Sequence, residues 1–527
     1  MKCLQNFFSR HPVLCDALRW VLPALVFGAA LRLLLMSYCP YALWGADSRS
    51  YFSFAHKLFN HGWISLGEKR RYLYPILMVP VTLLPDGPLR WLPLLQHTFG
   101  LMTLVPLAYT VRKTLVFWRF WIVPITVLYA GFPIIVSLEH QILGTTVFFA
   151  TLLWSFAGWI AWTSQSQLER ARRMFWMLFI PFALFILTKP SGRFVWPGFF
   201  VGFIIVTAWR LLTWKQITAL LMLLAITPTV GSKKQGAWLL YTATLPLTRL
   251  DTSQHAEYKA EIRDLVEPLR RNMGNYYVLQ LKEPFHFLGD PGEQDTRPLW
   301  KALGDNERLR NRIYLDLAIE GIKARPDLFL YLGLQRIIGS ANVSAFGTIH
   351  FADGYYVAHT AEYYAEAEED EESPIRLAFA LPKDGPIQSY EAYQHKLEPR
   401  PGSWQARAVQ AAVGAYGTKL DLFRFPKGQE RSISLVRPTF LAWWLVAGML
   451  LSVLPCYRRT LGVWMLIAIG QLFGVFLFSV VNTHYFAPVW PVLLVLMAVP
   501  ADVICTVIGR WNRLLALNAL SCAKPVQ

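Results

Sequence analysis

Ten long apolar segments run through this chain, and they constrain its fold more than any other feature. Each approaches the roughly 20 apolar residues that a helix needs to cross the hydrocarbon core of a bilayer. The segments are 19–38, 90–111, 120–137, 141–162, 174–188, 194–209, 216–231, 437–456, 461–480 and 486–508. A backbone that crosses lipid must satisfy its own hydrogen bonds, so the segments predict helices. We expect an all-α polytopic membrane protein with about ten transmembrane helices.

The composition agrees with this expectation. Charged residues make up 16% of the chain, whereas soluble domains contain about 25%. The 21 tryptophans suit side chains that anchor at lipid headgroups. A net charge of +17 would also fit nucleic-acid binding, but no basic soluble domain stands apart. We therefore expect no nucleic-acid partner, and assign the charge to cytoplasmic loops and anion sites.

A long polar region divides the apolar segments into two groups. The expected parts are an N-terminal transmembrane module at 1–232, an α-rich or mixed soluble domain at 233–430, and C-terminal helices with a short tail at 431–527. The soluble domain contains no cysteine, so it has no internal disulfide. Its acidic run from Glu362 to Glu372 is typical of a solvated loop, with cation or acceptor binding as the alternative.

Charges in the short loops predict the orientation, because cytoplasmic loops are enriched in lysine and arginine. With a cytoplasmic N-terminus, the inner loops carry Arg112, Lys113, Arg119, Arg170, Arg172, Arg173, Arg210, Lys215, Arg458 and Arg459, and the tail carries Arg510 and Arg513. The opposite side then receives the loop 39–72, the turns 138–140, 189–193 and 481–485, and the soluble domain. In a bacterium this chain would lie in the inner membrane, with both termini cytoplasmic and the soluble domain periplasmic. The short apolar stretch 73–85 contains three prolines and is expected to be interfacial or re-entrant.

Cations occur on the outer side, where the charge rule makes them scarce. They are Lys69, Arg70 and Arg71 in the first outer loop, Lys189 and Arg193 around a turn, and His484 in the last turn. Arginine and lysine supply the charge-assisted donors that a phosphate needs. Headgroup contact or a salt bridge explains any single one equally well, but together they favour an anionic ligand.

Two carboxylates stand out on the same side. Asp47 lies just after the first apolar segment in Trp44-Gly45-Ala46-Asp47-Ser48, where a neighbouring apolar edge suits a general base. Taken alone, this aspartate fits an N-cap for a helix at 48–58 better. Glu139 lies at the outer end of a segment, where an ionisable residue suggests function. The alternative for Glu139 is a structural pair with Lys189 or Arg193.

Several familiar signatures do not occur in this sequence. It has no P-loop, no GxGxxG after a strand, no GxSxG and no HExxH, which argues against an ATP-driven pump or a soluble-type hydrolase. It also has no CxxC or Cys/His cluster, so no metal site is expected.

The motifs, taken in order, resemble a known enzyme family. The first outer loop reads Gly45-x-Asp47-Ser48-x-x-Tyr51-x-x-x-Ala55-x-x-Leu58-x-x-x-Gly62, then Arg71-Tyr72-x-Tyr74-Pro75. Later matches are Glu139, Leu187-Thr188-Lys189-Pro190, Pro326 to Arg336, and His484-Tyr485-Phe486-Ala487-Pro488-Val489-Trp490-Pro491. This pattern resembles membrane glycosyltransferases of the GT-C fold. It is closest to the bacterial branch related to protein O-mannosyltransferases and the lipid A aminoarabinose transferase.

The resemblance implies a transferase that takes a sugar from a polyprenyl phosphate and inverts its anomeric centre. Asp47 would be the general base, with Glu139 as a second catalytic carboxylate, and Lys69, Arg70, Arg71, Lys189, Arg193 and His484 would bind the donor phosphate. The aromatic residues Trp44, Tyr51, Tyr72, Tyr74 and Tyr485 would contact the sugar or lipid. His484 replaces the family's usual arginine.

The resemblance also bears on cofactors and partners. The first loop lacks a DxD or an adjacent acidic pair, so neither a divalent metal nor another cofactor is expected. Membrane lipids surround the chain. The sequence does not distinguish between a glycolipid such as lipid A, a glycan and a protein as the acceptor.

Two other function classes compete with the transferase. A lipid-linked glycan ligase or flippase would also use outer cations, but it would not need the Asp47 loop. A secondary transporter would have related halves and ionisable residues at mid-membrane. Here the ionisable residues of the predicted spans lie at their outer ends, and the spans divide unevenly around the soluble domain.

Overall fold

The computed structural model describes residues 12–40, 73–82, 87–142, 144–205, 212–229, 233–271, 306–341, 437–478 and 486–522, together with isolated residues between these ranges. Helices account for nearly all of the described backbone. Within it, β1 (Phe423–Arg424) and β2 (Arg437–Pro438) form a two-stranded antiparallel pair beside the start of α24. The prediction of an all-α chain therefore holds for its architecture.

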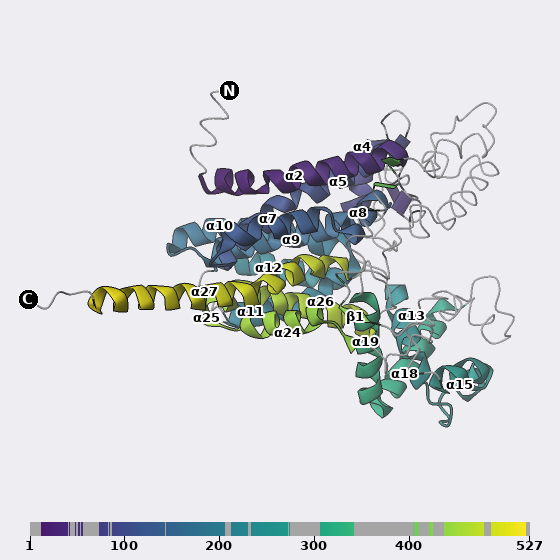
Figure 1. The fold of residues 1–527 in the computed structure, drawn as a ribbon. Coiled ribbons are helices and arrows are strands. Elements are labelled where there is room, and N and C mark those ends of the chain that lie inside the picture. The colour runs from purple at the N-terminus through teal and green to yellow at the C-terminus, as the bar shows by residue number, and fades with distance from the viewer. Residues whose placement is uncertain are drawn as a thin grey trace, which may run out of the picture.

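The larger part of the protein is a bundle of apolar helices. Its members are α2 (Pro12–Tyr38), α5 (Gly87–Met102), α6 (Leu104–Thr114), α7 (Trp118–Ala130), α8 (Pro133–His140), α9 (Thr145–Thr163), α10 (Leu168–Thr188), α11 (Trp196–Ile205), α12 (Trp214–Thr229), α24 (Phe440–Leu451), α26 (Val463–Phe478) and α27 (Trp490–Cys522). Figure 1 shows them side by side, with the first turn of α2 and the last turn of α27 at the same end.

Several of these helices can cross a bilayer, and the protein is therefore a membrane protein. By length and apolarity, 5 described helices qualify, or up to 7 if each bent pair is one span. The five are Arg19–Ser37, Arg90–Thr114, Thr145–Thr163, Leu168–Thr188 and Ala487–Arg510. The larger number predicted from the sequence, about ten transmembrane helices, stays a prediction. Helix α12 is a shorter apolar helix, and α7 with α8 bends by 44° at Gly131 and Phe132.

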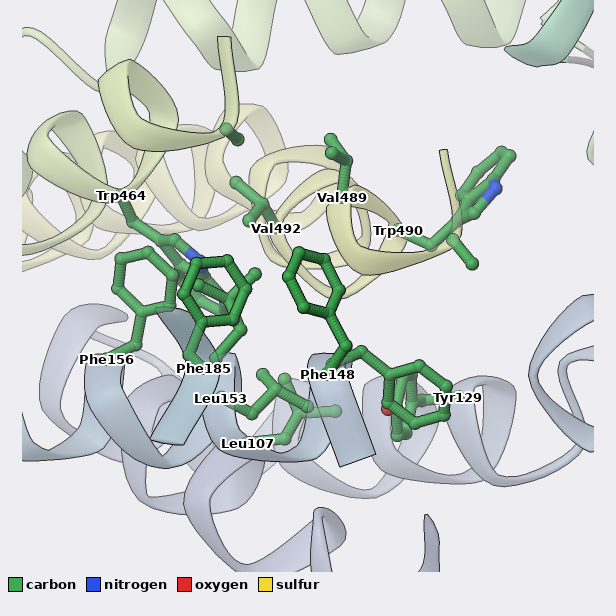
Figure 2. Close-up of a cluster of buried hydrophobic side chains, with 14 of the residues drawn as sticks. Leu107, Tyr129, Phe148, Leu153, Phe156, Phe185, Trp464, Val489, Trp490 and Val492 are labelled. Atoms are coloured by element: carbon green, nitrogen blue, oxygen red, sulfur yellow. The ribbon is translucent and has the colours of Figure 1, made fainter. Parts of the chain in front are cut away.

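Helix α9 forms the centre of the bundle and joins its two halves. Its side chains are buried on every face, as expected of a helix that is apolar all round. Phe148 of α9 stacks on Phe185 of α10 with ring centroids 4.2 Å apart, and Phe156 meets Trp464 of α26 at 4.5 Å. Figure 2 shows these rings between helices of the N-terminal and C-terminal halves. Aromatic packing thus holds together segments that are about 300 residues apart in sequence.

A second group of helices has its own core. It contains α13 (Lys233–Thr244), α14 (Ala256–Glu261), α15 (Arg263–Arg271), α18 (Glu307–Ala324) and α19 (Pro326–Ala341). Tyr241, Tyr258 and Tyr314 gather at its centre. In Figure 1 this group lies at the end of the bundle opposite the last turn of α27. The sequence had predicted helical patterns in this region, around 255–271 and 306–338.

Arg336 links the second group of helices to the bundle. This side chain is fully buried and donates hydrogen bonds to the carbonyl of Phe476 at 2.7 Å and to that of Ala243. Helix α19 packs against the end of α26, where the backbone of Gly333 lies close to the Leu477 side chain. On its other face α19 exposes Leu330, Tyr331 and Leu334.

Inside the second group, ionisable side chains join α14 to α18. Lys259 Nζ lies 2.7 Å from Glu320 Oε2, and His255 Nε2 lies 3.1 Å from Asp316 Oδ2. Partial burial raises the pKa of the Glu320 carboxyl, but hydrogen bonds from Lys259 and Thr252 outweigh it, so that pKa lies below its ordinary value.

At the other end of the bundle, Asp502 links the two halves of the chain. Its carboxylate accepts hydrogen bonds from the backbone N–H groups of Val116 and Phe117, at 2.9 and 2.8 Å, and from the Tyr457 hydroxyl at 2.8 Å. A carboxylate is favoured at this position because the first turn of α7 presents unpaired N–H groups. Sequence reasoning gave Asp502 no role.

Candidate functional site

The structure describes part of the site that the sequence predicted. The side chains of Glu139, Lys189, Tyr51 and Tyr74 are described. For Arg193 the backbone is described, within the short helix η1 (Pro190–Val195), but not the side chain. The other predicted site residues lie outside the described residues: Trp44, Asp47, Lys69, Arg70, Arg71, Tyr72, His484 and Tyr485. Their assignments stay predictions.

Described residues that follow α2, within the predicted first outer loop, pack against the turn between α8 and α9. Ser48 Oγ donates to the carbonyl of Ile142 at 3.3 Å, and the rings of Tyr51 and Tyr74 meet edge to face at 5.0 Å. Gly144 makes room for this contact, because a Cβ there would lie 3.2 Å from Tyr74 Cβ. Ser48 follows Asp47 directly in the sequence.

Gln96 of α5 fixes the end of α8 at the same place. Its amide donates to the carbonyls of Glu139 at 3.0 Å and of Gln141 at 2.8 Å, and its oxygen accepts from the Tyr74 hydroxyl at 3.2 Å. The last carbonyls of a helix have no partner within the helix. Gln96 therefore satisfies the end of α8 and holds Tyr74 of α4 (Leu73–Thr82) against it.

Glu139 is fully buried and forms a two-pronged ion pair with Arg32 of α2. Arg32 Nε lies 2.6 Å from one carboxylate oxygen and its Nη2 lies 2.7 Å from the other. The remaining Nη1 donates to the carbonyls of Gly28 and Ala130, at 3.1 and 2.9 Å. Both charges are thus matched, as a buried pair requires. Of the two structural partners predicted from the sequence, Lys189 donates to Thr145, and the side chain of Arg193 lies outside the described residues.

Arg32 and His97 are the residues that sequence reasoning missed. Both are buried inside helices, Arg32 at 3% exposure and His97 at 2%. The expectation that the ionisable residues of the spans lie at their outer ends stays a prediction, and Arg32 pairs with Glu139, which was predicted to lie at such an end. A signal was present, because an arginine within the first apolar segment is costly in lipid unless it has a partner. The sequence did not indicate which partner.

His97 extends the ion pair into a chain of side chains. Its Nδ1 lies 2.9 Å from Glu139 Oε2, and its Nε2 lies 3.1 Å from Nδ1 of His140. Glu139 and His140 are neighbours in α8, and both are fully buried. Helices α2, α5 and α8 thus contribute to one buried polar cluster, consisting of Arg32, His97, Glu139 and His140.

Lys189 lies beside the beginning of α9. Its Nζ donates to Thr145 Oγ1 at 2.5 Å and lies 6.0 Å from the centre of the Phe148 ring, and the residue is only 6% exposed. Thr145 is the first residue of α9, and the N-cap residue Gly144 provides no side-chain hydrogen bond. A helix N-terminus carries partial positive charge. Lysine, hydroxyl and helix end together make this place favourable for an anion.

The arrangement therefore combines a cationic position at Lys189 with two histidines and a neutralised ion pair, next to the turn that Ser48 contacts. Among the residues that the structure describes, no three His, Cys, Asp or Glu side chains are placed to hold a metal ion. In the comparisons with known proteins, neither a protein-family model nor a curated protein matches this chain.

Proposed function

We propose that this membrane protein is a glycosyltransferase that moves a sugar from a polyprenyl-phosphate donor to an acceptor at the outer face of the membrane. The observation that carries the proposal is the buried Lys189 at the start of α9, beside the α8–α9 turn that Ser48 contacts. A lysine there can stabilise the charge that develops on a departing phosphate. The residue next to Ser48 in sequence, Asp47, is the proposed base.

In this mechanism the acceptor hydroxyl attacks the anomeric carbon from the side opposite the phosphate. The new C–O bond forms as the bond to the phosphate breaks, and the phosphate leaves with the electron pair. One displacement inverts the sugar. Asp47 takes the hydroxyl proton, and Lys189, assisted by Lys69, Arg70, Arg71, Arg193 and His484, binds the phosphate. Because Glu139 is fully paired with Arg32, we assign it a positioning role and no contact with the sugar.

The proposed GT-C identity, the polyprenyl donor and the absence of a metal cofactor rest on the motif resemblance. The acceptor stays open between a glycolipid, a glycan and a protein. The competing ligase or flippase would handle the same donor without using Asp47.

A proton-coupled transporter is the second candidate, and one observation favours it. Buried ionisable residues within membrane helices often belong to proton pathways, and Arg32, Glu139 and His97 form such a group. A transporter would move its substrate whether or not Asp47 carries a carboxylate. The transferase would not form product without that carboxylate.

Asp47→Asn is expected to abolish sugar transfer. The loss follows because an amide cannot take the acceptor proton, a step that contributes about 10²–10⁴-fold. Mass spectrometry of envelope glycolipids and glycoproteins would compare cells that lack the chain with cells that produce the wild type, Asp47→Asn or Lys189→Ala. The matched control is Asp264→Asn, at an exposed position of α15. A glycan that depends on the chain but persists in Asp47→Asn would exclude the base assignment.

The Lys189→Ala variant tests the donor phosphate site independently of the base assignment to Asp47. It should raise the KM for the donor, because it removes a charge that binds phosphate. An unchanged KM in membranes that contain the full chain would place the phosphate elsewhere.

Single cysteines introduced at Arg170 and Asp264 should react with an impermeant maleimide from opposite sides of the membrane. Both positions are exposed, at the start of α10 and in the second group of helices. Inner loops are enriched in arginine, so Arg170 should be cytoplasmic and Asp264 periplasmic. The measurement is labelling of intact cells against permeabilised cells, in a background without the native cysteines. Labelling of both from the same side would contradict the topology and the proposed outer site with it.

A further inference from the structure

Helix α19 exposes an apolar face. Leu330 is 55% exposed, Tyr331 37% and Leu334 47%. Residues at this spacing lie on one side of a helix. After Asp327, these three residues are the exposed ones among the described side chains of α19. A helix at the surface of a soluble domain instead carries polar and charged residues at its exposed positions.

The buried side of the same helix carries polar side chains. Gln335, Arg336 and Ser340 are fully buried. Arg336 donates to the carbonyls of Phe476 and Ala243, and the Gln335 amide also donates to a backbone carbonyl within the protein. Helix α19 therefore turns hydrogen-bonding side chains toward the protein and an apolar surface outward. This distribution is typical of helices that are in contact with lipid, where polar residues face the protein interior.

The position of α19 brings its apolar face to the edge of the bundle. Figure 1 shows α19 lying across the direction of the bundle helices, at the end of α26. Ile337 of α19 packs against the core of the bundle. It lies on the same side of the helix as Leu334 and Leu330, which precede it by one and two turns. This side of α19 therefore begins on the bundle and continues beyond it, at the level of the last residues of α26.

We propose that α19 is an interfacial helix that inserts Leu330, Tyr331 and Leu334 into the membrane, on the side that carries the second group of helices. Because the bundle belongs to a membrane protein, lipid is the medium that borders its outer surface. Phe473 of α26 is 43% exposed and lies one turn before Leu477, which packs on α19. The apolar surface of the bundle thus continues onto α19. Tyrosine is favoured at such a boundary, because its ring is apolar and its hydroxyl can reach water.

The charged residues next to this face lie around the beginning of α19. Arg325 and Asp327 form a two-pronged exposed pair, with distances of 3.0 and 2.7 Å, so their charges cancel. Lys323, in the last turn of α18, is exposed. A lysine at this level can bind the phosphate of a lipid headgroup. The beginning of α19 therefore fits the headgroup region, and its next turns fit the boundary with the acyl chains.

The consequence is a fixed depth for the second group of helices. Arg336 ties α19 to α26, and the apolar face ties α19 to the lipid. The second group would then rest on the membrane surface rather than extend freely from the end of the bundle. This contact does not depend on sugar transfer, so it holds for any function of the protein.

Site-directed spin labelling of the full chain in lipid bilayers tests the interfacial position. Single cysteines at Leu330 and Leu334, in a background without the native cysteines, would each carry a nitroxide. Power-saturation EPR would compare collisions with oxygen, which concentrates in lipid, against collisions with a water-soluble nickel chelate. Both labels should favour oxygen over nickel, at a depth of about 5–10 Å in the headgroup and acyl boundary.

Two further labelled positions calibrate the measurement. Ile180 is 56% exposed within the candidate span Leu168–Thr188 and is the reference for lipid. Asp264 is exposed on α15 and is the reference for water. Labels at Leu330 and Leu334 that behave like the label at Asp264 would overturn the proposal. Few collisions with either reagent would overturn it as well, because a protein surface, such as a second copy of this chain, would then cover the face.

Discussion

Replacing Arg32 with methionine is expected to lower the free energy of unfolding by about 3–5 kcal/mol. The change keeps an unbranched apolar side chain but leaves the fully buried Glu139 carboxylate without its two-pronged partner. It also releases the carbonyls of Gly28 and Ala130. Reversible unfolding in mixed micelles, followed by far-UV circular dichroism, would measure the loss.

A double-mutant cycle separates the pair from the individual side chains. Glu139→Leu alone should also destabilise the protein strongly, because it leaves the Arg32 charge buried. The double variant with Arg32→Met and Glu139→Leu should regain much of the loss, since replacing a buried ion pair by apolar residues is often close to neutral. If the two single losses simply add in the double variant, the pair does not exist in the folded protein.

Replacing Gly100 with alanine is expected to disturb the same pair from the opposite side. A Cβ at this position of α5 would lie 1.8 Å from Glu139 Oε1, so the carboxylate must move away from Arg32. Overpacking of this kind costs about 1–3 kcal/mol, and the damaged ion pair adds to it. The same unfolding measurement applies.

Gly509→Ala is the matched control for this variant. It makes the same change in a helix, but the nearest heavy atom to its Cβ would be 3.9 Å away. Alanine favours the helix over glycine by up to about 1 kcal/mol, so this variant should be neutral or more stable. Equal effects of the two variants would mean that the close approach of α5 to Glu139 is not present in the membrane.

Much of the fold could be predicted from the sequence, because the segments that insert into a membrane are recognised by their local composition. A run of apolar residues predicts a helix without any knowledge of its neighbours. The predicted segment 141–162 and the observed α9, Thr145–Thr163, agree for this reason, and the same holds for α2 and α10. The break between α7 and α8 was not predicted, although Pro133 begins the second helix.

The candidate site was predicted less completely. Its position near the end of the bundle followed from cations and carboxylates that lie at the ends of apolar segments, with Lys189 and Glu139 as the described examples. The histidines were overlooked, because His97 lies among apolar residues and resembles any buried polar side chain. Only the approach of α5 to α8 brings His97 into the buried polar cluster with Glu139 and His140.

By itself, the sequence determined that this is a helical membrane protein, and roughly where its helices lie. It also singled out Glu139 as an ionisable residue that needs a partner, and Lys189 as a cation that favours an anionic ligand. The partners were decided by the tertiary structure alone. Arg32 and Glu139 are 107 positions apart, and Lys189 and Thr145 are 44 apart. Hydropathy and helix periodicity extend over one helix at most, whereas partner choice depends on which helix faces meet when α2, α5, α8, α9 and α10 pack.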